Sequence, residues 1–395
     1  MAIAIVWPAE SRLVEISVRF ERYIRGFRAL GHEAYAVCTS AAALGFAEPA
    51  ITCSNLAELN SPGFWDRLRP DAALVITWLG MADVLKALRP CCPFIVSIAD
   101  SDGQVGVRAH PRASWQRMLA QQRTLINKVR AAKFWLQQYL YADRRVAAPA
   151  IASAELSDAV IVGSAKSVEC LRHFYATMGR ADLGRKVHAI PYPVDDCFST
   201  SEVRKDRIER LVAIGRWDDP QKDAPWLAAA LELALRRRPT LQVSLFGPGG
   251  ERCFAPLCRK HQTVLLEGTK SAAIIAQRLA ESRALVLSSL WESGPIVASE
   301  ALSLGCTLIG PASIPSFASA VREGPFGTLA ARRSPRALAD AVLSEMAAWD
   351  AGQRDPIAQA SYWRPRFTEA AVCGQLAALW QGSPSHGQQY AATAR

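Results

Sequence analysis

Short apolar runs rich in β-branched residues alternate with longer helical patterns, and this alternation is the feature that most limits how the chain can fold. The first series of runs is AIAIV at 2–6, AYAVC at 34–38, ALVIT at 73–77, FIVSI at 94–98 and AVIVG at 159–163. Buried runs of this length, separated by helical stretches, are typical of a parallel sheet covered by helices. The first half of the chain therefore predicts one α/β domain.

A second series of the same kind follows a break in the pattern. The break is a segment with two prolines and a polar run, at 188–206. The second series is LVAIG at 211–215, LQVSLFG at 241–247, TVLLEG at 263–268, ALVLSS at 284–289 and TLIG at 307–310. The chain thus predicts an α/β fold of two Rossmann-like, doubly wound domains facing a central cleft, where ligands bind at the carboxyl ends of the strands.

The length of 395 residues leaves room for two or three domains. We expect an N-terminal domain over 1–195, a C-terminal domain over 207–364, a helix over 365–382 that packs back towards the N-terminal domain, and a disordered tail over 383–395. The N-terminus begins with an apolar run that lacks a basic leader, so it predicts a strand and not a signal peptide. No apolar run reaches the ~18 residues that crossing a bilayer requires. We therefore expect a cytoplasmic protein.

The ten cysteines are scattered and form no CxxC pair, so we expect no disulfide framework. Cys253, Cys258 and His261 could be three metal ligands, but a fourth is missing and the spacing fits no common zinc pattern. The sequence therefore predicts no metal site.

The net charge of +10 is concentrated in one segment, at 103–146. That segment has nine basic residues and one acidic residue, a net of +8, whereas the rest of the chain has 37 basic and 35 acidic residues, a net of +2. The basicity is therefore a local patch.

Within this segment, apolar residues from Trp115 to Leu140 recur mostly at steps of three and four, which predicts one long helix in the N-terminal domain. Its stripe could pack on the domain's own sheet while its cations stay in solvent. Alternatively, the helix docks on an anionic membrane, as a peripheral contact at the inner face, or grips a phosphate-bearing acceptor. Nucleic acid is the less favoured partner, because aromatic side chains lie among the cations and the rest of the chain is nearly neutral.

The stretch from Ala284 to Pro311 is the most informative for chemistry. It predicts a strand ending at Ser289, a loop carrying Glu292, and a helix that opens at Ser293-Gly294-Pro295 and contains Glu300. A helix N-terminus offers free N–H groups and a positive dipole end to an anion such as phosphate. Eight residues of helix separate two carboxylates by ~12 Å, so one could reach each end of an extended ligand. Both glutamates could equally be ordinary surface carboxylates.

This stretch resembles the E-x7-E region of retaining nucleotide-sugar glycosyltransferases of the family 4 type, which have the two-domain GT-B fold. Four further motifs occur in the expected order between about Ser157 and Trp380. They are SDAVIVGS at 157–164, HAIPYPVDDCF at 188–198, AIGRWDDPQKD at 213–223 and LFGPGG at 245–250. In that order they resemble the family's ADxVIxxS stretch, its PNGVD interdomain segment, its G-R-x(4,5)-K element and its glycine-bearing strand end.

The resemblance implies an enzyme that transfers a sugar from a nucleotide diphosphate to a hydroxyl acceptor with retention, in glycan, polysaccharide or glycolipid synthesis. Arg216 and Lys222 would hold the donor diphosphate, so that no metal or cofactor is needed; the donor would be UDP- or GDP-linked. Glu300 would bind the ribose and Glu292 would face the transferred sugar. The remaining donor contacts implied by the resemblance are Gly215, Gly247, Ser293, Gly294 and Ile296.

The sequence departs from the family pattern in three places. Pro295 follows the first glutamate and has no N–H to offer a phosphate. The glycine pair expected after the first strand is absent, with Ser11 and Arg12 as substitutes. The strand at 94–98 is followed by Asp100 and Asp102 where many members have a histidine. These two aspartates could cap the loop or position the acceptor; we interpret their D-x-D spacing as unrelated to metal binding.

Two other functions are compatible with these features. The basic segment could make the chain a nucleic-acid-binding protein or an enzyme that glycosylates nucleic acid. The chain could also be a non-catalytic member of the family that it resembles.

Overall fold

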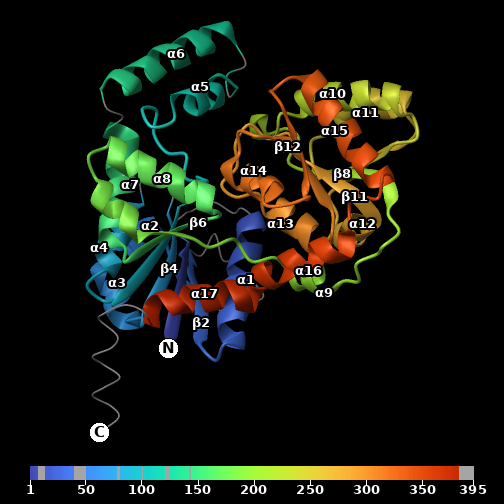
Figure 1. Cartoon of the computed structure of the whole chain (residues 1–395). Coiled ribbons are helices and arrows are strands. Elements are labelled where there is room, and N and C mark those ends of the chain that lie inside the picture. The colour runs from blue at the N-terminus through green and yellow to red at the C-terminus, as the bar shows by residue number, and fades with distance from the viewer. Residues whose placement is uncertain are drawn as a thin grey trace. The chain divides into compact units, whose positions relative to one another are not determined.

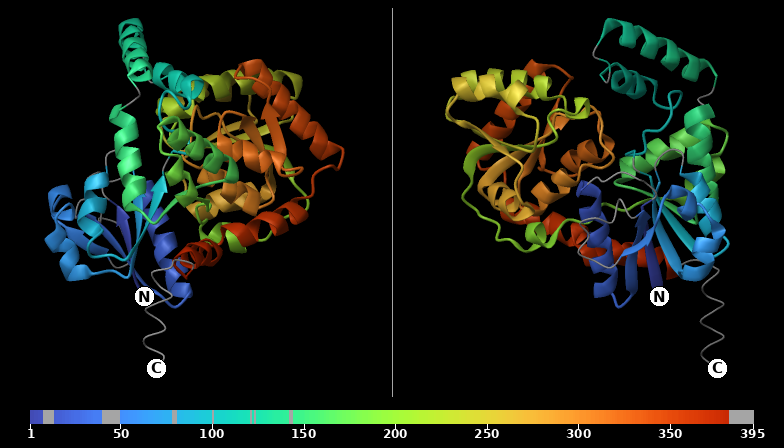
Figure 2. Two further views of the ribbon diagram at one scale, coloured as in Figure 1. Left: turned by 60° about the vertical axis from the view of Figure 1, so that its left-hand side comes forward. Right: turned by 180° about the vertical axis from the view of Figure 1, so that it is seen from behind.

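The computed structural model describes residues 1–7, 14–39, 50–77, 81–99, 101–120, 122, 124–141 and 144–381. The chain divides into two compact units (Figures 1 and 2). Unit 1 comprises Met1–Pro111, Leu136–Pro193 and Thr368–Arg395, and unit 2 comprises Arg112–Trp135 and Val194–Phe367. The predicted tail at 383–395 lies outside the described residues, as do Ser11, Arg12 and Asp100.

The sheet of unit 1 has seven parallel strands among the described residues, in the order β3-β2-β1-β4-β5-β6-β7. Its strands are β1 (Ala2–Trp7), β2 (Glu33–Thr39), β3 (Ala50–Cys53), β4 (Ala72–Thr77), β5 (Phe94–Ala99), β6 (Ala159–Val162) and β7 (Val187–Ala189). Its helices include α1 (Val14–Ala29), α2 (Leu56–Leu59), α3 (Pro62–Leu68), α4 (Ala82–Leu88), α7 (Arg144–Leu156), α8 (Ala165–Thr177) and the 3-10 helix η1 (Ala181–Lys186). Strands β1, β4 and β5 are buried along nearly their whole length, as expected where helices cover both faces of a sheet.

Unit 1 is completed by a helix that follows unit 2 in the sequence, α17 (Glu369–Gln381). Trp380 is fully buried and stacks on Phe27 of α1, with ring centroids 5.2 Å apart. Nearby, Arg25 donates from Nε to Oε2 of Glu369 over 3.1 Å and from Nη2 to its other carboxylate oxygen. Apolar burial and a two-point ion pair thus fix α17 to the first helix of the chain.

The sheet of unit 2 has six parallel strands among the described residues, in the order β10-β9-β8-β11-β12-β13. Its strands are β8 (Ile208–Ile214), β9 (Gln242–Phe246), β10 (Val264–Gly268), β11 (Ser282–Val286), β12 (Thr307–Pro311) and β13 (Gly327–Ala330). Its helices include η2 (Pro220–Lys222), α9 (Asp196–Thr200), α10 (Ala224–Arg237), α11 (Glu251–Lys260), α12 (Ala272–Glu281), α13 (Ile296–Ser303), α14 (Pro315–Arg322), α15 (Pro335–Asp350) and α16 (Pro356–Phe367).

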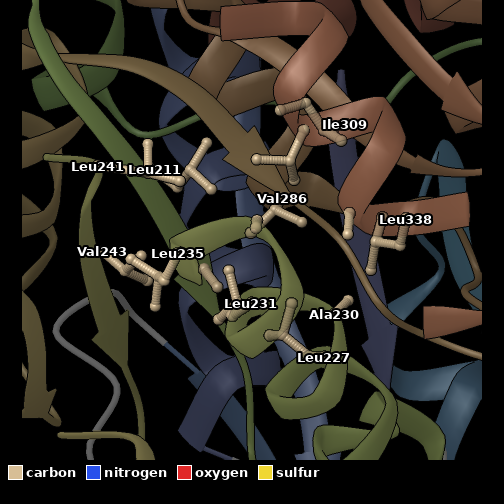
Figure 3. Packing of buried hydrophobic residues seen from close by; sticks show 14 of the residues in the cluster. Leu211, Leu227, Ala230, Leu231, Leu235, Leu241, Val243, Val286, Ile309 and Leu338 are labelled. Carbon is tan, nitrogen blue, oxygen red and sulfur yellow. The ribbon is translucent and has the colours of Figure 1, made fainter. Parts of the chain in front are cut away.

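Successive residues of these strands enter two different apolar cores, one on each face of the sheet. Leu211 and Ala213 of β8 pack with helices α10 and α15, whereas Val212 between them packs with α12 and α13. Figure 3 shows the first core, in which Leu227 and Leu231 of α10 lie against the strands. This alternation is the period of two expected of a sheet covered on both faces. The prediction of two Rossmann-like domains is therefore confirmed.

The structure corrects the prediction of a single helix from Trp115 to Leu140. Two helices replace it, α5 (Pro111–Ala120) and α6 (Leu125–Leu140). Thr124 caps the second helix, because its Oγ1 accepts from the N–H of Asn127 over 3.2 Å, as an N-cap side chain does. The apolar stripe of α6 does not pack on a sheet, because α6 has no buried residue.

Three shorter predictions also need correction. The strand expected to reach Ser289 ends at Val286. The break at 188–206 is not without structure: it contains the end of β7 and the short helix α9, and a division between the units falls between Pro193 and Val194. Strands β3, β7 and β13 have no counterpart among the strands that the sequence predicted.

All ten cysteines are free thiols. Burial raises the pKa of Cys38 and of Cys306 to about 11, and that of Cys92 to about 12. These three thiols are therefore protonated at neutral pH and are poor nucleophiles.

Candidate active site

The predicted donor residues of unit 2 gather where β8 and β11 end. Lys222, in η2 after β8, donates from Nζ to Oε1 of Glu292 over 2.7 Å. Both side chains are largely covered, with 17% and 10% of their surface exposed. Ser289 also donates to Oε1 of Glu292, and Gln221 donates to Oε2 over 3.4 Å. Glu292 is thus held by three donors from two loops.

The backbones of the same two loops are joined as well. Ser288 donates from Oγ to the carbonyl of Lys222 over 2.6 Å, and the N–H of Leu290 donates to the carbonyl of Gln221 over 2.8 Å. Gln221 also donates from Nε2 to the carbonyl of Trp291 over 2.8 Å. These bonds fix Lys222 and Glu292 as a pair, which is what an ordered binding site requires.

Arg333 is a member of this cluster that the sequence analysis missed. It donates from Nη2 to Oδ2 of Asp223 over 2.6 Å and to the carbonyl of Ser288 over 2.9 Å, and from Nη1 to the carbonyl of Ser289 over 3.2 Å. Its guanidinium also lies 4.1 Å from the ring centroid of Trp226. Arg333 thus ties the segment after β13 to both site loops, and no spacing motif could have indicated a partner 110 residues away.

Arg216 lies on the same loop as Lys222 but interacts with a different carboxylate. Its Nη2 donates to Oδ2 of Asp219 over 3.0 Å, and its side chain is 36% exposed. Asp219 also accepts the N–H of Gln221 through Oδ1 over 2.9 Å, so it caps η2. The structure therefore places both predicted cations in one short loop at the carboxyl end of β8.

Gly215 and Gly247 are brought together as two strands end. A Cβ added to Gly247 would lie 2.0 Å from the carbonyl oxygen of Gly215, and Gly247 has a φ of +108°. The N–H of Gly215 donates to Phe246 over 3.1 Å, and the N–H of Gly247 donates to Gly268 over 2.8 Å. Only glycine allows this close backbone approach beside the cationic loop.

Helix α13 begins at Ile296, directly after the Ser293-Gly294-Pro295 segment at which its start was predicted, and no side chain caps its N-terminus. Gly294, just before it, has a φ of +128°, which suits glycine alone. The first N–H groups of a helix have no partner within the helix, so those of Ile296 and Val297 can donate to an anion, whereas the N–H of Ala298 donates to the carbonyl of Pro295 over 2.9 Å. Glu300, inside α13, is 7% exposed.

Asp102, predicted to lie on the acceptor side, is a buried residue of unit 1. Asp102 is 1% exposed, with a φ of +49°, and accepts a hydrogen bond from Ser167 near the start of α8. Its carboxylate is thus directed into unit 1, where it holds the loop after β5 in place. Asp100 and Arg12 lie outside the described residues.

No group of three or more potential metal ligands occurs within the part of the chain that the structure describes. His261, one of the three residues considered for zinc, instead lies with Nε2 2.9 Å from Oε2 of Glu232. Lys260 and Arg236 donate to the same carboxylate, and these bonds, that of Lys260 first, lower the pKa of Glu232 to about 2. This histidine therefore belongs to a surface charge cluster.

The group of side chains around Lys222 and Glu292 can bind a doubly charged anion. Lys222 has three N–H donors and uses one on Glu292, so others remain for phosphate oxygens. Arg216 supplies a second, accessible cation on the same loop. Because the side chains of Lys222 and Glu292 are mostly withdrawn from water, their interactions with a ligand are less screened than those of surface charges.

Comparison with known proteins identifies the class to which this site corresponds. Residues 208–347 match a family model described as "Glycosyl transferases group 1". The match covers β8 to most of α15 and includes Arg216, Lys222, Glu292 and Glu300. No curated protein sequence matches the chain.

Solved structures of glycosyltransferases share the fold of the whole chain. A sucrose-phosphate synthase from Thermosynechococcus elongatus matches with a TM-score of 0.61 and 19% identity, over 99% of this chain and 100% of that chain. The Anabaena protein HepE in complex with UDP matches with a TM-score of 0.63 and 15% identity, over 97% and 100%. A pneumococcal O-GlcNAc transferase, GtfA, in complex with UDP and GlcNAc, matches with a TM-score of 0.57 and 15% identity. The match covers 81% of this chain, which spans 59% of GtfA.

The fold is therefore that of GT-B glycosyltransferases, and its second unit matches the glycosyl transferases group 1 family over residues 208–347.

Proposed function

We propose that this protein is a retaining glycosyltransferase that transfers a sugar from a nucleoside diphosphate to a hydroxyl acceptor. The observation that carries the proposal is the Lys222–Glu292 ion pair at the carboxyl ends of β8 and β11. Glu292 lies in the loop just before helix α13, whose N-terminus no side chain caps. Both residues of the pair lie within the segment that matches the family model. Such an arrangement offers cations to a diphosphate and a carboxylate to the sugar.

Lys222, Arg216 and the first N–H groups of α13 would hold the donor diphosphate. The bond from the anomeric carbon to the diphosphate breaks as the bond to the acceptor oxygen forms on the same face. The leaving phosphate takes the acceptor proton. Negative charge builds on the diphosphate during this step, and preorganised cations stabilise it more in the transition state than in the ground state. We propose that these groups replace a metal ion.

The two glutamates would act at opposite ends of the donor. Glu292, held by Lys222, Gln221 and Ser289, would orient the hydroxyls of the transferred sugar. Glu300, the fifth residue of α13, would accept hydrogen bonds from the ribose hydroxyls. Fixed carboxylates at both ends would align the anomeric carbon with the acceptor.

We propose UDP as the donor nucleotide, because UDP occupies the complexes of HepE and GtfA. The acceptor would be a glycan or a lipid-linked hydroxyl used in polysaccharide or glycolipid synthesis, as a lipopolysaccharide outer core galactosyltransferase with a TM-score of 0.58 also suggests. Asp100 and Arg12 stay predictions on the acceptor side, whereas Asp102 supports the loop from inside. Nucleic acid is not favoured as a partner.

We expect UDP to bind the wild-type protein in buffer containing EDTA, because cations of the chain replace the metal. A ligand at 100 times its dissociation constant stabilises the protein by ~2.7 kcal/mol, so the thermal transition rises measurably. Thermal-shift titrations with UDP, GDP and ADP, with and without EDTA, test this. Absence of any nucleotide-induced shift, or a strict need for manganese, would contradict the proposed site.

The glutamates should separate by role when each is changed to glutamine. Glu300→Gln forfeits charged hydrogen bonds to the ribose and should weaken UDP binding roughly tenfold or more. Glu292→Gln should leave UDP affinity intact and lower kcat of sugar transfer by at least about tenfold, since its contact is with the sugar. Calorimetry with UDP and steady-state kinetics measure the two effects. Equal losses of UDP affinity in both variants would refute the assignment of Glu292.

A further inference from the structure

Helix α6 presents large apolar side chains to solvent along its whole length. None of its residues is buried, and Leu125, Ile126 and Val129 are 79%, 66% and 63% exposed. Further apolar residues with at least 40% exposure are Phe134, Leu136, Tyr139, Leu140 and, just beyond the helix, Tyr141. Isolated exposed apolar residues are common, but a continuous set on one helix marks an interaction surface.

The aliphatic residues of α6 share one face. At ~100° per residue, Leu125, Val129, Leu136 and Leu140 lie within about 60° of one another around the helix axis. Ile126 borders this group. We call Leu125, Val129, Leu136 and Leu140 the apolar face of α6. Helix α6 has 16 residues and is therefore about 24 Å long.

Side-chain contacts hold α6 on a side other than its apolar face, and these contacts leave the apolar face exposed. Trp135 packs edge-on against Trp115 of α5, with ring centroids 5.2 Å apart, and donates from Nε1 to Oγ of Ser114 over 2.9 Å. At the other end, Arg108 donates to the carbonyls of Tyr139 and Leu140 over 2.7 and 3.0 Å. Figures 1 and 2 show α5 and α6 side by side. The apolar face lies about 80° to 140° around the axis from Trp135.

Cations border the apolar face. Lys128 and Arg130 lie on opposite flanks of it and Lys133 lies at its edge, and all three are exposed. Among the described residues, no ion pair joins any of them to a carboxylate. The sequence contains no aspartate or glutamate from Gly103 to Ala142. The segment that contains α5 and α6 thus carries positive charges only.

We propose that α6 lies in the headgroup region of an anionic bilayer, with its apolar face towards the acyl chains. A bilayer surface accepts both features, since aliphatic side chains enter the acyl boundary while Lys and Arg extend to lipid phosphates. A second copy of the chain is a poorer partner, because the cations of the two copies would repel each other. Nucleic acid is also a poorer partner, because it would leave the apolar face in contact with water. No described helix has the length and apolar character to cross a bilayer, so α6 lies along the surface. This inference does not depend on the donor chemistry.

Co-sedimentation of the full chain with phosphatidylcholine vesicles, with and without phosphatidylglycerol, tests the proposal. The wild type should bind only the anionic vesicles and should dissociate as salt is raised. Val129→Gln with Leu136→Gln removes apolar area and keeps every cation, so the partition coefficient should fall roughly tenfold or more. Lys128→Gln with Arg130→Gln and Lys133→Gln should abolish the preference for anionic lipid.

Phe134→Gln is the matched control, because Phe134 is an exposed apolar residue of α6 on the side away from the apolar face. It should bind vesicles as the wild type does. Circular dichroism and UDP binding should be unchanged in all variants, which separates this proposal from the donor site. Equal binding of the Val129/Leu136 variant, or none by the wild type, would overturn the proposal. A concentration-dependent dimer lost in that variant would assign the face to a second copy instead.

Discussion

Changing Lys222 to alanine should lower kcat of sugar transfer roughly 10²- to 10³-fold, the cost of removing one preorganised donor at a developing oxyanion. Lys222 is bonded to Glu292 at 2.7 Å and its backbone carbonyl accepts from Ser288, so its ammonium group is fixed before the donor binds. The variant would therefore lack a cation that is already in position to stabilise the charge on the leaving phosphate. Steady-state kinetics with a UDP-sugar donor, or donor hydrolysis if the acceptor is unidentified, measure the loss.

The fold should tolerate this change, because Glu292 keeps hydrogen bonds from Ser289 and Gln221. Lys205→Ala is the matched control, since Lys205 is an exposed lysine of the same unit outside the site. It should leave kcat and KM unchanged. Wild-type turnover in Lys222→Ala would remove Lys222 from the reaction and, with it, the central argument for the donor site.

Gly247→Ala should destabilise unit 2 by about 3 kcal/mol. A positive φ costs a residue with a Cβ ~1–2 kcal/mol, and forcing an extra carbon into packed structure costs ~1–3 kcal/mol more. Here the new Cβ would lie 2.0 Å from a backbone oxygen, that of Gly215, which has no side-chain freedom to retreat. Urea unfolding followed by tryptophan fluorescence measures the effect, because Trp217 is buried beside this turn and bonds to the carbonyl of Phe246.

Gly352→Ala is the control that separates strain from collision. Gly352 also belongs to unit 2 and has a positive φ, of +68°, but an added Cβ would meet nothing within 4 Å. It should cost only about 1 kcal/mol. If both variants lost the same stability, close approach of Gly215 and Gly247 would not be what requires glycine.

The sheets, and the position of Arg216 and Lys222 in one loop, could be predicted because their information is local. Each strand of the core is a run of buried residues between helical stretches, and Arg216 and Lys222 lie within seven consecutive residues after β8. The turn geometry that glycines impose is local too, as at Gly247. Local patterns are what a single sequence displays most clearly.

Contacts between distant segments could not be predicted in the same way. Arg333 joins Asp223 across 110 residues, and nothing in the spacing of either residue indicates the other. Residues 121–124 are polar, but apolar residues recur at helical steps on both sides of them, so the sequence did not reveal the N-cap at Thr124 that separates α5 from α6. A shared period also cannot show whether a helical stripe faces a sheet or solvent, because both burial and membrane contact select aliphatic residues.

The placement of α17 on α1 affects the order in which the two units can form during synthesis. Every residue of unit 2 precedes Thr368 in the chain, whereas unit 1 needs α17 to cover Phe27 and to pair with Arg25. Domains usually fold as they emerge, the N-terminal one first. In this chain the unit that begins first must wait, with the α17-binding side of α1 in water, until all of unit 2 has left the ribosome.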